Sequence, residues 1–152
     1  MHEYHKDGST RMELKEKFEL HIPSVLGFEK VAMEYAASVA KMMQFPAERI
    51  EALKTAVAEA CLNAIEHGNK LDATTKVGIS FTVEPSTLRV AVQDRGTGIG
   101  QISPPNIEHT IAGKYKPRGW GIFLIKNLMD EVEFETAPGY GNVVRMVIHL
   151  QR

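Results

Sequence analysis

Two pairs of short segments in which apolar and polar residues alternate constrain the fold of this chain more than any other feature. The first pair covers residues 76–84 and 87–93, and the second covers residues 131–136 and 142–150, with a proline between the members of each pair. Alternation with a period of two is typical of strands that bury one face, and the intervening turn residues favour hairpins. Both pairs therefore predict antiparallel strands.

The remaining regular segments are one strand and three helices. Alternation predicts the strand over residues 18–22, and Ser24 behind it is suited to cap a helix over residues 25–44. Two further helices are predicted over residues 46–67 and 121–129. This order predicts an α+β fold, a two-layer α/β sandwich with the helices on one face of a mixed, largely antiparallel sheet.

Composition and charge indicate one soluble domain. The chain has 152 residues, of which 43% are hydrophobic and 24% charged. Residues 1–12 are predicted to be a flexible N-terminal tail, and residues 13–152 a single domain. The formal net charge of -1 leaves no overall basic field to attract nucleic acid or an anionic membrane, so we expect neither as a partner.

The sequence gives no sign of export. Residues 1–8 are too polar for a secretory signal, and no stretch approaches the roughly 18 apolar residues of a membrane span. The single cysteine, Cys61, excludes an internal disulfide framework and suits a reducing compartment. We therefore expect a cytoplasmic protein.

The helix predicted over residues 46–67 has two different faces. At about 100° per residue, its apolar side holds Ile50, Leu53, Val57, Cys61 and Ala64. Its polar side holds Glu59, Asn63 and Glu66. A polar stripe on a helix is usually a solvent-facing surface. Here the turns before Glu59 carry small residues in place of long charged ones, which favours a site, whereas Cys61 is predicted to pack in the core.

The polar side offers groups that suit a nucleotide bound with a metal ion. Asn63 presents a neutral oxygen of the kind that a hard cation such as Mg²⁺ binds. Glu59, one turn earlier, can accept a proton from an attacking hydroxyl or water. His67, at the helix end, either contacts a phosphate or, more commonly for such a residue, interacts with the last carbonyls of the helix.

A turn motif follows the hairpin over residues 76–93. Asp94 stands at the end of the second strand, before Gly96, Gly98 and Ile99. Most strings of this kind are ordinary turns. In a binding site, the carboxylate of Asp94 can accept a hydrogen bond from an exocyclic amine such as that of adenine, and the glycines allow the backbone to approach the base.

A long loop over residues 96–119 precedes the last helix, and such loops in compact domains are usually functional. Its end carries the cations Lys114, Lys116 and Arg118. They form either a phosphate clamp or a solvated basic loop. The helix entry that follows consists of Gly119, Trp120, Gly121 and Ile122. This entry can present backbone N–H groups to phosphates, and we expect the tryptophan to lie near a ligand or partner.

Together these motifs resemble the GHKL superfamily, whose ATP-binding unit is called the Bergerat fold. Three boxes define that superfamily: an Asn-bearing helix, Asp-x-Gly-x-Gly, and Gly-x-Gly before a helix. Residues 59–67, 94–98 and 119–121 match them in this order. Within the superfamily, the chain is most similar to the bacterial anti-sigma factor serine/threonine kinases, through residues 52–64 and 121–132.

The resemblance implies ATP and Mg²⁺ as cofactors and gives each residue a role. Glu59 would be the catalytic base, Asn63 the magnesium ligand and Asp94 the adenine-binding carboxylate. The backbone of residues 119–122 would face the phosphates, with Arg118 as a charge stabiliser. The family often has Gly-Thr before the last strand, with the Thr helping to hold the nucleotide. This chain has Gly-Asn there, so Asn142 is the expected substitute.

The resemblance also implies partners. A kinase of this group would phosphorylate a small anti-anti-sigma protein of the STAS type on serine or threonine, and would sequester a sigma factor when that protein is absent. It could form a homodimer. Two other functions remain open from the residues: an ATP-gated protein-binding module, or an ATPase or switch kinase of another regulatory pathway without a sigma target. Glu59 counts against the binding module, because binding alone requires no base.

Overall fold

The computed structural model describes residues 2–4, 10–12, 15–95, 118–137 and 141–150. Its elements are β1 (His2–Tyr4), β2 (Thr10–Met12), β3 (Glu16–Pro23), α1 (Glu29–Met42), α2 (Ala47–Asn63), the π-helical turn η1 (Ala64–Gly68), β4 (Lys76–Val83), β5 (Thr87–Gln93), α4 (Arg118–Leu128), β6 (Glu131–Ala137) and β7 (Gly141–His149). In this part of the chain, no helix combines the length and apolar character that a membrane crossing requires.

The main sheet confirms both predicted hairpins. The described strands form a five-stranded sheet in the order β3-β4-β5-β7-β6, so β3 and β6 are its outer strands. β4 pairs with β5, and β6 pairs with β7. We predicted a mixed, largely antiparallel sheet, and the pairings between these described strands are all antiparallel.

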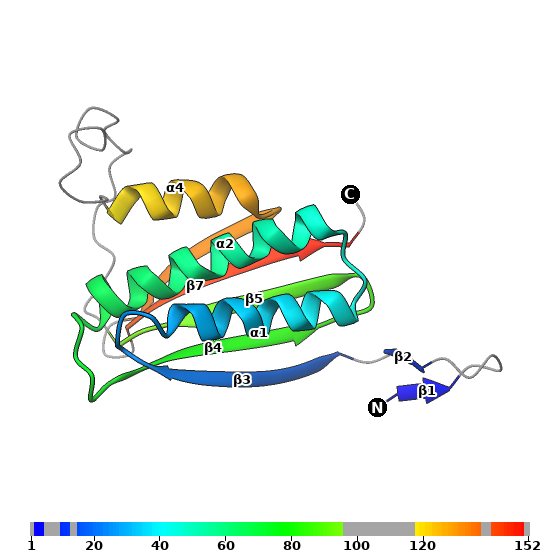
Figure 1. Ribbon diagram of the computed structural model, residues 1–152, viewed down its shortest axis with the longest axis horizontal. Coiled ribbons are helices and arrows are strands. Elements are labelled where there is room, and N and C mark those ends of the chain that lie inside the picture. Colours follow the sequence, from blue (N-terminus) through cyan, green and yellow to red (C-terminus); the bar gives the residue numbers. More distant parts are fainter. Residues whose placement is uncertain (1, 5–9, 13–14, 96–117, 138–140, 151–152) are drawn as a thin grey trace.

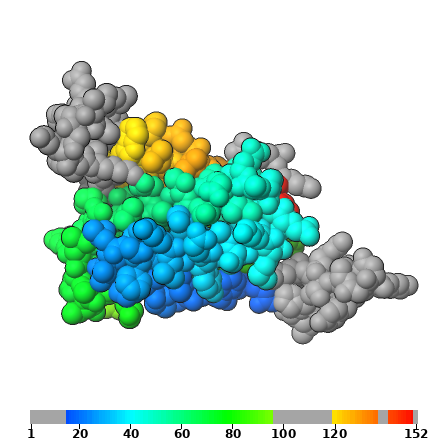
Figure 2. All heavy atoms as spheres, in the orientation of Figure 1, coloured from blue at the N-terminus to red at the C-terminus, as the bar shows by residue number. Residues whose placement is uncertain are grey.

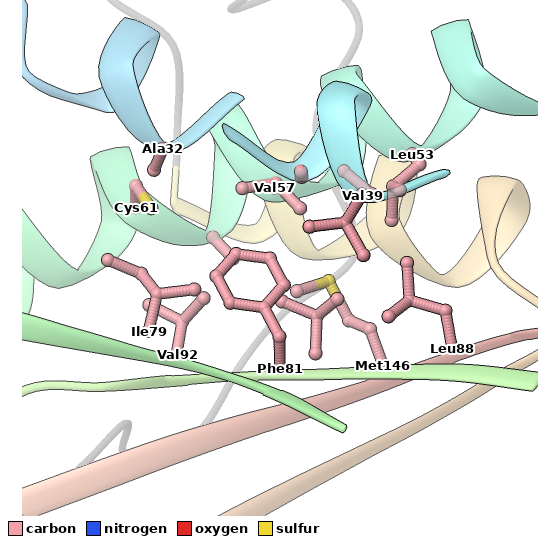
Figure 3. Close-up of a cluster of buried hydrophobic side chains, with 14 of the residues drawn as sticks. Ala32, Val39, Leu53, Val57, Cys61, Ile79, Phe81, Leu88, Val92 and Met146 are labelled. Carbon is pink, nitrogen blue, oxygen red and sulfur yellow. The ribbon is translucent and has the colours of Figure 1, made fainter. Parts of the chain in front are cut away.

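The helices form a second layer on one face of this sheet, as predicted (Figure 1). α2 lies between α1 and α4, and the three helices run side by side in the space-filling view (Figure 2). The buried residues between the layers include Leu53, Val57, Cys61, Phe81 and Met146 (Figure 3). The predicted apolar side of α2 is thus confirmed as its core-facing side, and its polar side is free to face α4.

The start of α1 differs from the prediction. The helix begins at Glu29, and Ser24 does not cap it. Ser24 is buried instead, and its hydroxyl accepts hydrogen bonds from Asn69 Nδ2 and from the Thr75 hydroxyl, both at 2.9 Å. The carboxylate of Glu29 accepts the N–H of Gly27, which lies before the helix, at 2.6 Å, and no side chain caps the helix start itself. A tertiary partner has therefore replaced the local capping bond that serine usually makes.

The end of the second helix also differs. We predicted regular helix to His67, but α2 ends at Asn63 and the chain continues as the π-helical turn η1. The N–H of Asn69 closes this turn by donating to the carbonyl of Ala64 at 2.8 Å. Such wide turns often occur at functional sites. α4 begins at Arg118, three residues before the predicted start at Gly121. The prediction was late because the glycines at positions 119 and 121 suggested a break in regular structure.

The predicted N-terminal tail contains two short strands. β1 and β2 pair antiparallel, with Glu3 opposite Arg11, and form a separate two-stranded sheet. Regular structure within residues 1–12 was not expected from the sequence. The flexibility of this segment and the domain boundary at residue 13 stay predictions.

An ion pair joins three elements at the far end of α2 from Asn63. Arg49 Nη2 donates to Asp130 Oδ2 at 2.6 Å and to the carbonyl of His149 at 3.1 Å. The N–H of His149 donates to the same Asp130 oxygen at 2.7 Å. The side chains of Arg49 and Asp130 are only 15% and 12% exposed. This pair ties the start of α2 to the turn before β6 and to the end of β7.

We expect the Arg49→Met substitution to lower the free energy of unfolding by about 2–4 kcal/mol, because the largely buried carboxylate of Asp130 then lacks the cation that it pairs with. The matched control is Arg145→Met, which breaks an exposed pair with Glu135 and should cost less than about 1 kcal/mol. Urea unfolding followed by circular dichroism measures both. Equal losses for the two variants would contradict the stabilising role of the Arg49 pair.

The thiol of Cys61 is predicted to be inert in the folded protein. Burial, with a smaller contribution from the charge of Glu29, raises the pKa of Cys61 to about 12. The thiolate is the reactive form, so a disulfide reagent at pH 8 should label the protein only after denaturant is added. As the pH rises, the thiol ionises in the unfolded chain before it ionises in the folded protein. The contribution of the neutral Cys61 thiol to the free energy of unfolding is therefore complete below the ordinary pKa of a thiol, and it is lost as the pH rises toward 12. Rapid labelling of native protein would show that the thiol is accessible.

Candidate active site

The polar side of α2 faces the first turn of α4. Glu59 and Asn63 are half-buried, one helical turn apart, and Gly121 of α4 lies against them. A Cβ atom built on Gly121 would lie 2.8 Å from Glu59 Oε2 and 3.3 Å from Asn63 Nδ2. Only glycine therefore allows α4 to begin this close to the two side chains. The structure thus brings together the first and third of the predicted motifs.

Asn63 has an unsatisfied side chain. Within the described residues, its Nδ2 is the one buried side-chain nitrogen or oxygen without a hydrogen-bond partner. Leaving a buried amide unpaired costs free energy, so native proteins rarely do it without a reason. Rotation of the amide exchanges its oxygen and nitrogen at little cost. The position can therefore present an oxygen to a cation.

Asp94 is buried at the end of β5 and is held by Asn142. Its Oδ1 accepts hydrogen bonds from the backbone N–H and from Nδ2 of Asn142, each at 3.1 Å. The N–H of Asp94 donates to the Asn142 carbonyl at 3.0 Å, and the Thr136 hydroxyl donates to Asn142 Oδ1 at 3.0 Å. Asn142 is 2% exposed and Asp94 is 5% exposed, so their hydrogen bonds to each other are buried, whereas Thr136 is exposed. The structure thus places these two predicted residues in direct contact, and their contacts with a nucleotide stay predictions.

Two glycines pack directly on Asp94. A Cβ atom on Gly68 would lie 2.1 Å from Asp94 Oδ2, and one on Gly141 would lie 2.0 Å from the Asp94 carbonyl oxygen. Gly141 also has a φ of +94°, which favours glycine. Neither was predicted as a site residue. The requirement for glycine at these two positions has no signal in the sequence, because the contact that imposes it is tertiary.

A small recess separates Asn63 from Asp94. Its cavity volume is about 10 Å³, which is room for about one water molecule. It is lined by Ala60, Asn63, Ala64, Val92, Asp94, Ile122, Asn142 and Val144. Its walls are mostly apolar and its polar groups converge from α2, β5 and β7, but in this structure it is too small to hold a nucleotide base.

The other predicted residues lie in different surroundings. Glu66 and His67 are exposed on η1 and do not line the recess. Trp120 is half-buried, and its ring stacks on that of Phe123 at 5.9 Å between centroids. Gly119 is half-buried in the first turn of α4, whereas Ile122 is buried and lines the recess.

Part of the predicted site falls outside the described residues. This holds for Gly96, Gly98, Ile99, Lys114 and Lys116. It holds as well for the side chain of Arg118, whose backbone starts α4. Their predicted contacts with base and phosphates stay predictions.

Known proteins resemble this chain in sequence and in fold. The model of the histidine kinase-like ATPase domain family matches residues 28–148. The serine-protein kinase RsbW of Bacillus licheniformis is 33% identical over 126 residues, which cover 77% of this chain and 74% of that protein. The anti-sigma F factor of Bacillus subtilis is 27% identical over 140 residues, or 91% of this chain and 96% of that protein.

The fold has a counterpart in a crystal structure of the RsbU and RsbW domains of a Mycobacterium tuberculosis protein. The TM-score is 0.64 at 15% identity, with 88% of this chain covered. This chain spans 32% of that longer chain. The family match includes the helix of Glu59 and Asn63, the turn of Asp94 and the start of α4, so the predicted resemblance is confirmed: the chain belongs to the histidine kinase-like ATPase family, in the group of the RsbW and anti-sigma F proteins.

Proposed function

We propose that this protein is an ATP-dependent serine/threonine protein kinase of the anti-sigma type. It binds ATP with Mg²⁺, transfers the γ-phosphoryl group to a hydroxyl of an anti-anti-sigma protein, and binds a sigma factor when that protein is absent. The observation that carries the proposal is the placement of Glu59 and the unsatisfied Asn63 against Gly121 at the start of α4. The names of the relatives, serine-protein kinase and anti-sigma factor, agree with it.

The base of the nucleotide would bind beside Asp94, where the recess would have to widen to admit it. Apolar walls from Val92, Ile122 and Val144 suit a flat aromatic ring. A carboxylate has about four lone pairs over its two oxygens, and Asn142 uses two of them at Oδ1, so Asp94 can accept a further hydrogen bond from the exocyclic amine of adenine while Asn142 remains bound to it.

The phosphates would lie at the first turn of α4. The first N–H groups of a helix have no partner inside the helix, and they favour anions. Gly121 keeps a side chain out of this space, and Asn63 has an amide to offer. Both features fit Mg²⁺, which takes few protein oxygens beside water and phosphate and which neutralises phosphate charge when it is bound. The side chains of Lys114, Lys116 and Arg118 are proposed to add positive charge.

Glu59 is proposed as the general base. It lies one turn before Asn63, and its Oε2 faces the start of α4. As the serine or threonine oxygen forms its bond to the γ-phosphorus, Glu59 accepts the hydroxyl proton, the bond to the bridging oxygen breaks, and ADP leaves. Such transfers depend mainly on positioning and charge stabilisation, with the base adding a smaller factor.

Several finer features belong to this proposal. The acceptor is expected to be of the STAS type, and two copies of the kinase are expected to associate, in keeping with the resemblance of the sequence. We place the reaction in the cytoplasm, where ATP and a sigma factor meet. The exposed Glu66 and His67 would contact the phosphates or partner only from the rim of the site.

Glu59→Gln tests the role of the base. We expect transfer to an anti-anti-sigma protein, detected as a mass gain of one phosphate, to slow by roughly 100-fold, since the amide cannot accept the proton. ATP affinity measured by calorimetry should change by less than about fivefold, because the shape is retained. The control is Glu51→Gln, an exposed carboxylate on the same helix.

Two results would contradict the proposal. One is a wild-type protein that phosphorylates none of the anti-anti-sigma proteins tested from its own genome. The other is a Glu59→Gln variant that transfers the phosphoryl group as fast as the Glu51→Gln control, which would show that Glu59 is not the general base. In the first case, ATP-dependent partner binding without turnover would replace the kinase.

Gly121→Ala tests the close approach of α4. The added methyl group would meet Glu59 Oε2 at 2.8 Å, so we expect phosphoryl transfer to fall by roughly tenfold or more through displacement of the reacting groups. Gly78→Ala is the control, because its methyl group meets nothing closer than His21 Cε1 at 3.5 Å. Equal rates for the two variants would show that the first turn of α4 does not approach the reaction.

A further inference from the structure

Asn69 is a buried polar residue that the proposed phosphoryl transfer does not use. It follows η1 directly, is 7% exposed, and closes the turn with its backbone N–H. A buried amide costs free energy unless its hydrogen bonds are made. The contacts of this side chain therefore indicate what it is for.

The side chain joins segments that are distant in sequence. Its Nδ2 donates to Ser24 Oγ at 2.9 Å and to the carbonyl of Lys76 at 3.2 Å. Its Oδ1 accepts the backbone N–H of Arg95 at 2.7 Å. The partners define the orientation of the amide, because a backbone N–H can only donate and a carbonyl can only accept.

The contact with Arg95 reaches the candidate base-binding residue. Arg95 follows Asp94, whose carboxylate is held on one side by Asn142 and is touched on the other by Gly68. Gly68 and Asn69 are consecutive residues. The end of η1 thus contacts both the Asp94 carboxylate and the backbone that continues from it.

We propose that Asn69 is a positioning residue for the base end of the nucleotide site. Its hydrogen bond to the Arg95 N–H sets where the Asp94 carboxylate stands relative to α2, and thereby sets the selectivity for adenine over guanine. This inference rests on the proposed function, since it requires a purine beside Asp94.

The physical reason is the difference between the two purines at ring position 6, which is the position proposed to face Asp94. At the same ring position adenine carries an amine that donates to a carboxylate, whereas guanine carries a carbonyl oxygen that a carboxylate repels. A site built on a hydrogen bond discriminates strongly, but only while its groups are held within a fraction of an ångström. Loss of the Arg95 bond frees the backbone beside Asp94 and weakens that discrimination.

The test compares Asn69→Ala with Ser24→Ala. Ser24→Ala removes one hydrogen bond of the Asn69 amide but leaves its bond to the Arg95 N–H. It therefore controls for the loss of stability without changing the contact next to Asp94. We expect Asn69→Ala to lower the ratio of ATP to GTP affinity by roughly tenfold, and to raise KM for ATP while kcat stays within about twofold of wild type. Ser24→Ala should keep the wild-type ratio.

Asn69→Asp keeps the length of the side chain but replaces the donor to Ser24 and to the Lys76 carbonyl by a second acceptor. It keeps an acceptor for the Arg95 N–H, so the ratio should stay within about threefold of wild type. Hydrogen exchange at the Arg95 amide gives a readout that needs no nucleotide, and it should speed up in Asn69→Ala but not in Ser24→Ala.

Two outcomes would overturn the inference. Equal ATP-to-GTP ratios in the alanine variants at positions 24 and 69 would make Asn69 a structural residue only. If the Arg95 amide exchanged at the wild-type rate in Asn69→Ala, the hydrogen bond from Arg95 to Asn69 would not hold this backbone in place. A wild-type protein that binds neither nucleotide would instead overturn the proposed function, and with it the purine selectivity, while the exchange data would still decide whether Asn69 holds Arg95.

Discussion

The packing of α4 against the polar side of α2 is the contact on which the candidate site depends. The opposite side of α2 is committed to the core through Leu53, Val57 and Cys61, so the helix cannot rotate to relieve the approach. Gly121 makes the approach possible because it places no atom between the helices. A proton acceptor, an amide and a helix start thereby meet on a rigid support, which favours chemistry that needs accurate positioning.

A second constraint acts around Asp94. The carboxylate is buried between Gly68 and Asn142, and glycine is required at position 141 by both φ and space. Residues that surround a charged group this closely leave it few alternative positions. The free-energy cost of burying the charge is offset by the donors of Asn142, and the result is a carboxylate of defined direction at the wall of an apolar recess.

The sequence predicted those features that depend on local patterns. The hairpins follow from alternation, and the two faces of α2 follow from helical spacing. Ser24 was wrongly predicted as a cap, because its partners Asn69 and Thr75 come from distant positions that no local rule includes. Asn69 itself lies beyond the end of the predicted helix, and η1 has no sequence signal that separates a π-turn from an α-helix. Contacts between distant segments explain each of these differences.

The outer strand β6 carries carboxylates at every second position. Glu131, Glu133 and Glu135 are exposed, and two of them are held by His149 and Arg145 on β7. A strand at the border of a sheet has free backbone groups that can recruit another chain. A second copy that approached border to border would bring like charges together. This border therefore resists the open-ended stacking of sheets that leads to aggregates.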